Sequence, residues 1–446
     1  MSLSDLLLLS RRDLWRVGIV GALLVAACLW VSLRFLEPIP PRRIVLASGP
    51  PSSLYHQHAE RYKELLAREG VTLEERMTEG AGDNLRLLLD RNSGVDLGFV
   101  QGGVARFPEA NSVVMVASLY YEPLWIFVRR GEPIDALAQL TGKRIGMGGP
   151  GSGTYAMAVP LLAASNVTTA NSTLLQMPAD QAIGALKIGY LDAMVIVGGL
   201  RTPAVLTALK DPALGAVSLA QATVYPPRYS FLTLRTLPAG AIAFVPLIPP
   251  RDLTLVSTEA MLVARDDLHP AIVTLLLEAT RDEHDDQGFF EGPNEFPNIE
   301  QVDLRVSQDA LRHKRFGPSL LSRYLPFWAA ALLERFVIIV VPLLVVMVPV
   351  IRFLPQVMSW RVRSRIYRLY GELKLLEREI GSRNGALPIE QWLAHLDRIE
   401  QAAVRMGTPV SYASEAYTLR EHIALVRRIV LQKAADQQRP ERGEVA

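Results

Sequence analysis

The sequence predicts an α/β protein with two lobes, flanked by two apolar segments and followed by a helical tail. Between about residues 43 and 282, short aliphatic runs alternate with segments of helical periodicity, which is the pattern of parallel strands joined by helices. Glycine pairs end two of the expected strands, at residues 102–103 and 198–199. Because loops at the carboxyl ends of parallel strands meet at one edge of a sheet, this repetition indicates two facing lobes.

The first lobe is expected to contain three parallel strands joined by two helices. These strands are residues 43–48, 71–77 and 95–101, and the helices are residues 53–69 and 85–90. The second lobe has expected strands at residues 124–129, 143–147, 173–177 and 192–197, with helices at residues 155–164 and 179–187. Residues 255–263 predict a returning strand, residues 269–282 a long helix and residues 289–297 a loop.

A glycine-rich stretch joins a strand to a helix in the second lobe. Residues 144–155 read Arg-Ile-Gly-Met-Gly-Gly-Pro-Gly-Ser-Gly-Thr-Tyr. Glycine lets a ligand approach the backbone, and unpaired N–H groups at a helix start favour negative charge. The hydroxyls of Ser152 and Thr154 add donors. The stretch therefore predicts a cradle for a small anion.

Three known sequence motifs resemble parts of this glycine-rich stretch. Gly146, Gly148 and Gly151 match the dinucleotide fingerprint, but Pro150 interrupts the turn and no acidic residue follows at the ribose distance. A P-loop requires lysine where Gly153 stands, and Ser152 lacks the setting of a hydrolase elbow. The remaining alternative is an ordinary glycine-rich turn without a ligand.

Two apolar segments, residues 17–33 and 336–351, approach the length of a bilayer span. Arginines precede the first and follow the second, so the positive-inside rule places both termini in the cytoplasm and the intervening domain in the periplasm of a bacterial inner membrane. The expected divisions are a cytoplasmic start (1–16), a transmembrane helix (17–36), a periplasmic domain (37–330), a second transmembrane helix (331–354) and a cytoplasmic helical tail (355–446). Within the periplasmic domain, lobe I covers about 43–121 and 231–322, and lobe II about 122–230.

Composition excludes some classes of protein. With 47 basic and 45 acidic residues the formal net charge is +2, which gives no electrostatic case for nucleic acid. The single cysteine, Cys28, cannot form an intramolecular disulfide. Residues 25–28 resemble a lipoprotein processing site, so a cleaved and lipidated start is the alternative to an uncleaved anchor. Apolar residues continue to Leu33, which favours the anchor.

Residues 148–155, the opening loop at Ser48, residues 99–101 and the Tyr-Glu-Pro of residues 121–123 resemble the TAXI family of TRAP-transporter solute receptors over about residues 43–286. The resemblance implies a two-lobed, type II periplasmic-binding-protein fold that closes on a small anionic solute, either a carboxylate or an amino acid such as glutamate. It implies partnership with TRAP permease subunits and no cofactor or metal. The implied pocket is lined by Ser53, Tyr55, Asp83, Asn84, Gln101, Tyr121, Ser152, Gly153, Thr154, Tyr155 and Gly198.

The sequence departs from this family at two places near the implied pocket. Residues 50–56 lack the usual Gly-Gly and paired aromatics, and Ala81 stands where the family has serine. Ligand identity therefore stays open. Arg201 is a candidate carboxylate clamp, with an exposed surface charge as the alternative. No nucleophile, base and orienting group can be grouped, so we predict a binding protein and not an enzyme.

Residues 361–380, 389–406 and 415–433 predict three helices in the tail. They form either a self-packed anchor or a docking surface for a permease. The alternative function is a ligand sensor that signals through the second apolar segment to this tail. We expect the loop at residues 289–297 and four prolines to interrupt any rigid rod between the lobes and the tail, which disfavours the sensor; these are Pro318, Pro326, Pro342 and Pro349.

Overall fold

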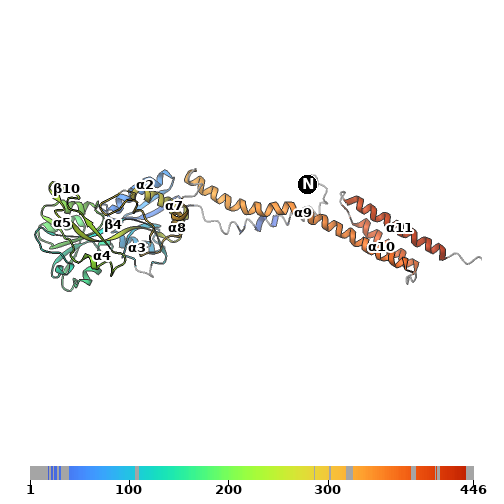
Figure 1. The fold of residues 1–446 in the computed structure, drawn as a ribbon, viewed down its shortest axis with the longest axis horizontal. Helices are drawn as coiled ribbons and strands as arrows, with labels where there is room; N and C mark the ends of the chain where they lie inside the picture. Colours follow the sequence, from blue (N-terminus) through green and yellow to red (C-terminus); the bar gives the residue numbers. More distant parts are fainter. Residues whose placement is uncertain are drawn as a thin grey trace, which may run out of the picture. The chain divides into compact units, whose positions relative to one another are not determined.

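The computed structural model describes residues 40–105, 110–285, 287–300, 303–317, 325–382, 388–406, 408 and 412–437, with isolated positions between 19 and 31. The chain divides into two units by its internal contacts (Figure 1). One unit is residues 37–334 and contains the strands; the other comprises residues 1–36 and 335–446 and its described part is helical.

Lobe I is built on three parallel strands, as the alternating pattern predicts. The order is β2, β1, β3, with β1 in the middle. Ser53 is the N-cap of the first helix, because its side chain accepts a hydrogen bond from the backbone N–H of His56. The elements are β1 (Arg43–Ala47), α2 (Leu54–Arg68), β2 (Thr72–Arg76), α3 (Ala81–Leu89) and β3 (Leu97–Gln101).

Lobe II repeats this plan. Its three parallel strands follow the order β7, β5, β6. The elements are β5 (Arg144–Met147), α4 (Gly153–Ala164), β6 (Thr173–Gln176), α5 (Ala179–Lys187) and β7 (Ala193–Val197). The parallel strands and helices expected in both lobes are thus confirmed, although α3 begins four residues before its expected start.

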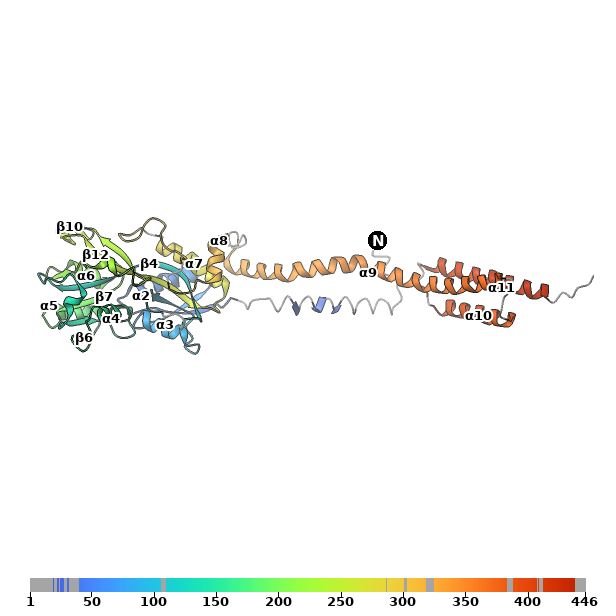
Figure 2. The same ribbon diagram turned by 60° about the horizontal axis from the view of Figure 1, so that its bottom comes forward.

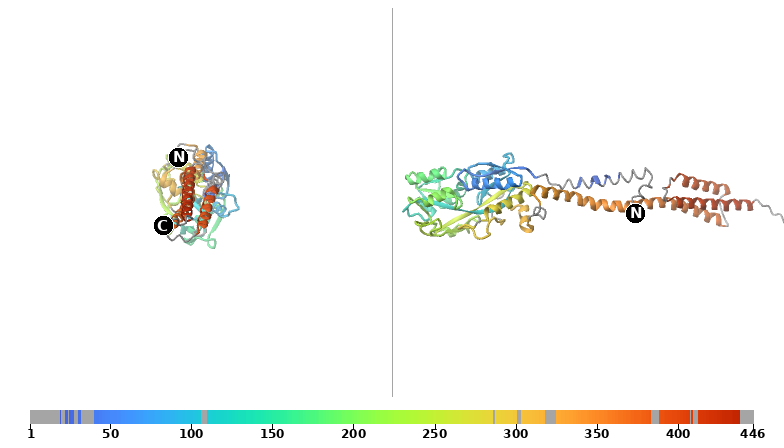
Figure 3. Two further views of the ribbon diagram at one scale, coloured as in Figure 1. Left: turned by 90° about the vertical axis from the view of Figure 1, so that its right-hand side faces the viewer. Right: turned by 90° about the horizontal axis from the view of Figure 1, so that it is seen from above.

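Two long strands belong to both lobes: β4 (Val113–Arg129) and β12 (Leu253–Arg265). β4 pairs with β12 as far as Pro123 and with β7 from Leu124 onward. Through β12 and β4 the strands of both lobes join one ten-stranded sheet, in which the strands of lobe I precede those of lobe II (Figure 3). The expected lobe boundary at residues 121–122 therefore falls inside β4. These strands form the connection about which the lobes can move.

The sequence pattern places the start of β4 eleven residues too late. Residues 113–128 are buried throughout, so no alternation of exposed and buried residues marks the strand. Several short elements were not expected either. They are α6 (Pro203–Lys210), β8 (Leu214–Ala216), β9 (Thr233–Leu237), the hairpin of β10 (Ala243–Phe244) and β11 (Leu247–Ile248), and α8 (Gln308–Phe316).

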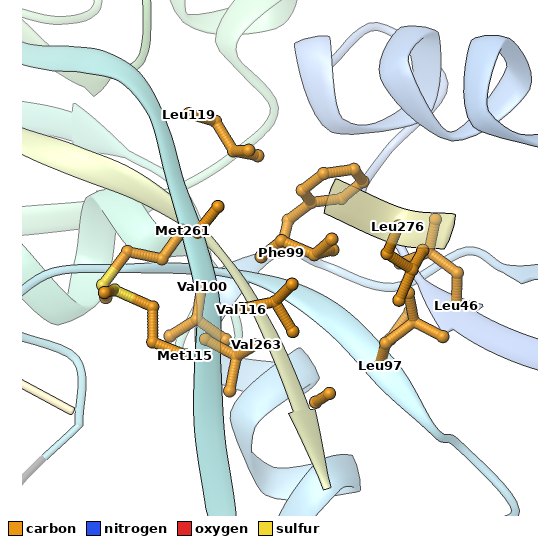
Figure 4. Close-up of a cluster of buried hydrophobic side chains, with 14 of the residues drawn as sticks. Leu46, Leu97, Phe99, Val100, Met115, Val116, Leu119, Met261, Val263 and Leu276 are labelled. Carbon is orange, nitrogen blue, oxygen red and sulfur yellow. The ribbon is translucent and has the colours of Figure 1, made fainter. Parts of the chain in front are cut away.

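Each lobe has its own hydrophobic core. In lobe I, side chains from β1 and β3 pack beneath α7 (Pro270–His284), as Figure 4 shows for Leu46, Phe99 and Leu276, while Met261 of β12 lies with Met115 of β4 on the other face. Phe99 is fully buried there. Lobe II has buried clusters on the two faces of its part of the sheet. Separate cores allow the lobes to behave as rigid bodies.

The helical unit contains most of α9 (Phe327–Gly381), with α10 (Ile389–Arg405) and α11 (Ala413–Gln437). These helices lie side by side around a leucine- and isoleucine-rich core (Figure 2). Arg427 of α11 bridges Asp397 and Glu400 of α10, each at 2.6 Å. The three predicted tail helices are confirmed.

The second apolar segment lies within α9. The helix continues through Pro342 and Pro349, so the interruption expected at these two prolines is wrong. Each proline removes one backbone hydrogen bond, whereas the turns on either side keep theirs. Most of the first expected span, residues 17–36, lies outside the described residues. Within the part of the chain that the structure describes, no helix reaches the combination of length and hydropathy needed to cross a membrane.

Candidate ligand-binding site

The two lobes touch at the carboxyl ends of their strands. The backbone N–H of Asp83 in lobe I donates to the carbonyl of Gly151 in lobe II at 2.9 Å. A Cβ on Gly153, at the start of α4, would overlap the side chain of Gln101, which ends β3. A Cβ on Gly199 would lie 3.0 Å from Leu54. Small residues in lobe II therefore allow this close approach.

The glycine-rich stretch forms the predicted helix start and receives a carboxylate. The N–H of Gly151 donates to Oε2 of Glu79, a lobe I residue, at 3.2 Å. Ser152 caps α4, because its hydroxyl accepts the N–H of Tyr155 at 3.1 Å and donates to the carbonyl of Gly149 at 2.7 Å. Oγ1 of Thr154 accepts the N–H of Val197 at 3.0 Å. The stretch accommodates an anion, but the Ser152 hydroxyl is already used within lobe II.

A buried carboxylate, Glu122 of β4, lies behind this contact. The Tyr55 hydroxyl donates to its Oε2 at 2.9 Å, and Nε2 of Gln101 donates to the same oxygen. Burial raises the pKa of Glu122 to about 7, even though both hydrogen bonds favour the charged form. Tyr55 stacks on Phe99 with 5.0 Å between ring centroids.

Two further polar atoms near Glu122 are buried without a hydrogen-bond partner among the described residues. They are Oε1 of Gln101 and the hydroxyl of Tyr120. Both residues lie opposite Ala260 of β12, one on each neighbouring strand. Directly paired residues project to the same face of a sheet, and Tyr120 and Glu122 share a face because they are two apart. The three groups therefore lie on one face, separated by the short side chain of Ala260.

Tyr121 does not join this cluster, since consecutive strand residues point to opposite faces. Its hydroxyl donates to Oε1 of Glu295, and Arg235 lies 3.6 Å from its ring centroid. Nη2 of Arg235 is 3.3 Å from the same Glu295 oxygen. Phe296, in the segment expected to be a simple loop, is buried against Tyr121 at 4.9 Å between centroids.

Asn84 is a fully bonded structural residue. Its Nδ2 donates to the carbonyls of Ser48 and Phe99, at 2.5 and 2.8 Å, and its Oδ1 accepts from the Thr78 hydroxyl at 2.6 Å. These bonds tie the start of α3 to the ends of β1 and β3. Asn84 thus has no donor left for a ligand.

The remaining predicted pocket residues also serve the scaffold. Ser53 caps α2, and Asp83 pairs with Arg86 at 3.0 Å. The carbonyl of Gly198 accepts the indole N–H of Trp125 at 2.8 Å. Tyr155 packs, partly buried, on the lobe II core. Of the predicted set, the structure brings Tyr55, Gln101 and Gly153 together with Glu122 and Tyr120, and it places Asp83 against Gly151 at the same lobe contact.

Sequence reasoning quoted Glu122 only as part of a motif. A usable signal was present: Glu122 is the only charged residue between positions 113 and 128, a stretch that is otherwise mostly apolar. A lone acid in a run of that kind indicates a buried carboxylate, which is rare unless it is paired or functional.

Other candidate features lie away from this cluster. Arg201 acts electrostatically on Glu291. Burial raises the pKa of Glu291, and the positive charge of Arg201 lowers it in part. The side chains of His56, Glu60 and Glu75 each offer one atom that could bind a metal ion, and these atoms lie within 4.8 Å of one another. Nδ1 of His56 lies 2.8 Å from Oε1 of Glu75. A cavity of about 270 Å³ lies in lobe II beside β8, and none of the predicted pocket residues lines it.

Two α/β lobes joined by two strands, with buried polar groups where they meet, form the architecture of proteins that close around a small solute. The fold is of the periplasmic-binding-protein type. Residues 46–288, more than half of the chain, match the model of the NMT1-like family. The chain belongs to this family, which places it among solute-binding proteins and not among enzymes.

Three solved structures illustrate the likeness. The aliphatic sulphonate binding protein SsuA from Escherichia coli is 15% identical, with a TM-score of 0.37 over 54% of this chain and 68% of that one. The alkanesulfonate-binding protein SsuA from Xanthomonas axonopodis pv. citri, bound to MOPS, is 16% identical, with a TM-score of 0.38 over 55% and 74%. The amino acid transporter protein AbpA from Streptococcus pneumoniae, bound to L-arginine, is 15% identical, with a TM-score of 0.34 over 54% and 88%. These ligands are properties of those proteins.

Proposed function

We propose that the protein is a membrane-anchored extracytoplasmic receptor that binds a small organic acid or amino acid by lobe closure. It delivers this solute to a TRAP-type secondary transporter, as receptors of the TAXI family do. The observation that carries the proposal is the contact between lobes: the glycine-rich stretch of lobe II meets Gln101 and receives a carboxylate from lobe I. An anionic solute finds the same N–H donors there.

The membrane anchor rests on the apolar residues 336–351 and the arginines that follow them. Several apolar side chains of α9 are exposed, including Phe336, Val345 and Val348. Apolar side chains in contiguous exposed groups are typical of surfaces that meet lipid or another protein. We therefore place the binding domain in the periplasm and both termini in the cytoplasm.

The first test measures binding and closure together in the full chain, held in nanodiscs. Exposed positions Glu64 and Gln181, one on each lobe, are changed to cysteine in a Cys28→Ser background and spin-labelled. We expect calorimetry to detect binding of at least one acid from a panel of small carboxylates and amino acids. The same acid should shorten the mean distance between the labels and narrow the distribution of distances, because it binds the closed state preferentially. No heat and no distance change with any acid would refute the proposal.

The second test locates the ligand. We expect the Ser152→Ala, Thr154→Ala double variant to lose about 1 to 3 kcal/mol of binding free energy for each charge-assisted bond removed. The matched control is Thr141→Ala with Ser172→Ala, which removes two hydroxyls of lobe II away from the lobe contact. Unchanged affinity in the first variant would show that the ligand lies elsewhere.

The sensor is kept as a second candidate because α9 is helical through both prolines. A sensor requires that the ligand bias two states of an element reaching the tail, whereas a receptor needs only a tether. The test uses a shortened chain that ends after Arg365 and so lacks all the buried residues of the helical core. A smaller deletion, of residues 381–446, would leave apolar residues of α9 such as Leu373 uncovered. We expect equal solute affinity in full and shortened chains, together with weaker binding to the permease. A several-fold difference in solute affinity would favour the sensor.

A further inference from the structure

Glu122 is a buried carboxylate whose hydrogen-bond donors are neutral. Both donors, Tyr55 and Gln101, bond to Oε2. In the described part of the chain, no ion pair includes Glu122. Burying a carboxylate without a cation costs free energy, because neutral hydrogen bonds replace only part of its hydration. Among the described residues, the domain therefore supplies no cation for the ionised form of Glu122.

The surroundings of Glu122 offer acceptors and few donors. Oε1 of Gln101 and the Tyr120 hydroxyl are buried, without partners among the residues described, on the same face of the sheet. Gln101 lies against Gly153, so this group of acceptors reaches the contact between the lobes. Unmatched buried polar groups are costly and rare in folded proteins. A ligand that enters here must supply a donor to Oε1 of Gln101, and it also meets the Tyr120 hydroxyl, which can accept as well as donate.

An ammonium group has the required chemistry. It carries three N–H donors, a positive charge and no acceptor. Glu122, Gln101 Oε1 and the Tyr120 hydroxyl supply three acceptors. A guanidinium prefers both oxygens of a carboxylate in one plane, but Oε2 of Glu122 already accepts two bonds. A divalent metal favours a charged or imidazole ligand set over one amide and one phenol.

We propose that Glu122, with Gln101 and Tyr120, receives the ammonium group of the solute, so that the ligand is an amino acid and not a simple carboxylate. This inference rests on the proposed function, since it assigns the second end of the ligand whose carboxylate meets the glycine-rich stretch. Glu122 is then the residue that determines specificity. Its charge is neutralised by the solute itself.

The test compares acids that differ only by the amino group. L-Glutamate is paired with glutarate, and L-leucine with 4-methylpentanoate, by calorimetry on the full chain in nanodiscs. We expect at least one amino acid to bind tenfold or more tightly than its partner. Glu122→Gln should weaken binding of the amino acid by 10- to 100-fold and that of the desamino acid by less than threefold.

Glu259→Gln is the matched control. Glu259 is a partly buried acid opposite Tyr121, hence on the other face of the sheet, and its Oε2 also has no described partner. This variant should keep the wild-type preference. Gln101→Met provides a second variant that retains Glu122, and we expect the preference to fall there too.

The outcomes separate the two proposals. Desamino acids that bind as tightly as amino acids, or a preference unchanged in both Glu122→Gln and Gln101→Met, would overturn the inference while leaving the receptor in place. If none of the four acids binds and the wider panel also fails, the proposed function is refuted, and the inference with it. Loss of both affinity and folding stability in Glu122→Gln would assign the residue a structural role instead.

Discussion

The two faces of β4 near the lobe boundary hold their acids in different environments: Glu295 is partly exposed, whereas Glu122 is buried. On one face, Glu295 pairs with Arg235, which also stacks on Tyr121. On the other, Glu122 has only the neutral donors Tyr55 and Gln101. Adjacent residues of one strand thus enter two environments, one that contains a cation, Arg235, and one that contains none among the described residues. The difference teaches that the proposed ligand site is marked by a carboxylate without a cation and not by a large cavity.

The largest effect is expected from packing on the Glu122 face. Phe99 is fully buried and stacks on Tyr55, so we expect Phe99→Ala to lower the free energy of unfolding by about 4 kcal/mol. Denaturant unfolding of the full chain measures it. The control is Phe289→Ala, whose side chain is 54% exposed and should cost less than about 0.5 kcal/mol. Similar losses in both variants would show that Phe99 does not hold this face.

The second effect distinguishes the two acids by pH. The folded pKa of Glu122 is about 7, above its ordinary 4.5, so the folded state binds a proton more tightly than the unfolded state. The contribution of this group to stability is then greatest below pH 4.5 and is lost as the pH rises through 7, by up to about 3 kcal/mol. Tyr55, Tyr120 and Gln101 face it from α2, β4 and β3 and have no charge to change in this range.

We expect Glu122→Gln to remove this decline, so that the variant equals the wild type near pH 4.5 and is more stable at pH 8. Unfolding curves of both proteins across this range provide the measurement. Parallel curves would mean that Glu122 is not the group that titrates.

The third effect concerns the paired face. Arg235→Gln leaves Glu295 without its cation, and we expect a loss of about 2 kcal/mol, less than for a fully buried pair because a quarter of the Arg235 side chain is exposed. Arg235→Lys should recover only part of it, since lysine lacks the planar group that stacks on Tyr121. Arg43→Gln, at an exposed pair with Glu74, is the control and should change little. Equal effects at both pairs would contradict the comparison.

The smallest effect tests the caps that sequence reasoning assigned to the pocket. Ser152→Ala and Ser53→Ala each remove a helix N-cap, at α4 and α2, and should each lower stability by about 1 kcal/mol. Thermal unfolding of the full chain measures both. Unchanged stability in either variant would contradict the role of that serine as an N-cap.

The sequence by itself determined the repeated order of strands and helices, the glycine-rich start of α4 and the helices of the tail. These features depend on local periodicity, on turn-forming glycines and on caps a few residues away, all of which are visible along the chain. Tyr55, Gln101 and Gly153 could be assigned to one region because they stand at ends of such elements, where loops of a parallel sheet converge.

The tertiary structure alone decided which of these residues can meet a ligand. Asn84 is removed from the site by partners that lie 36 and 15 residues away. Tyr121 was expected at the pocket, but Glu122 takes that place because consecutive strand residues point to opposite faces of the sheet. The sequence does not say which face each helix and segment will cover. Only the pairing of β3, β12 and β4 over Ala260 places Gln101 and Tyr120 beside Glu122. Long-range register fixes that pairing, and local sequence preferences do not encode it.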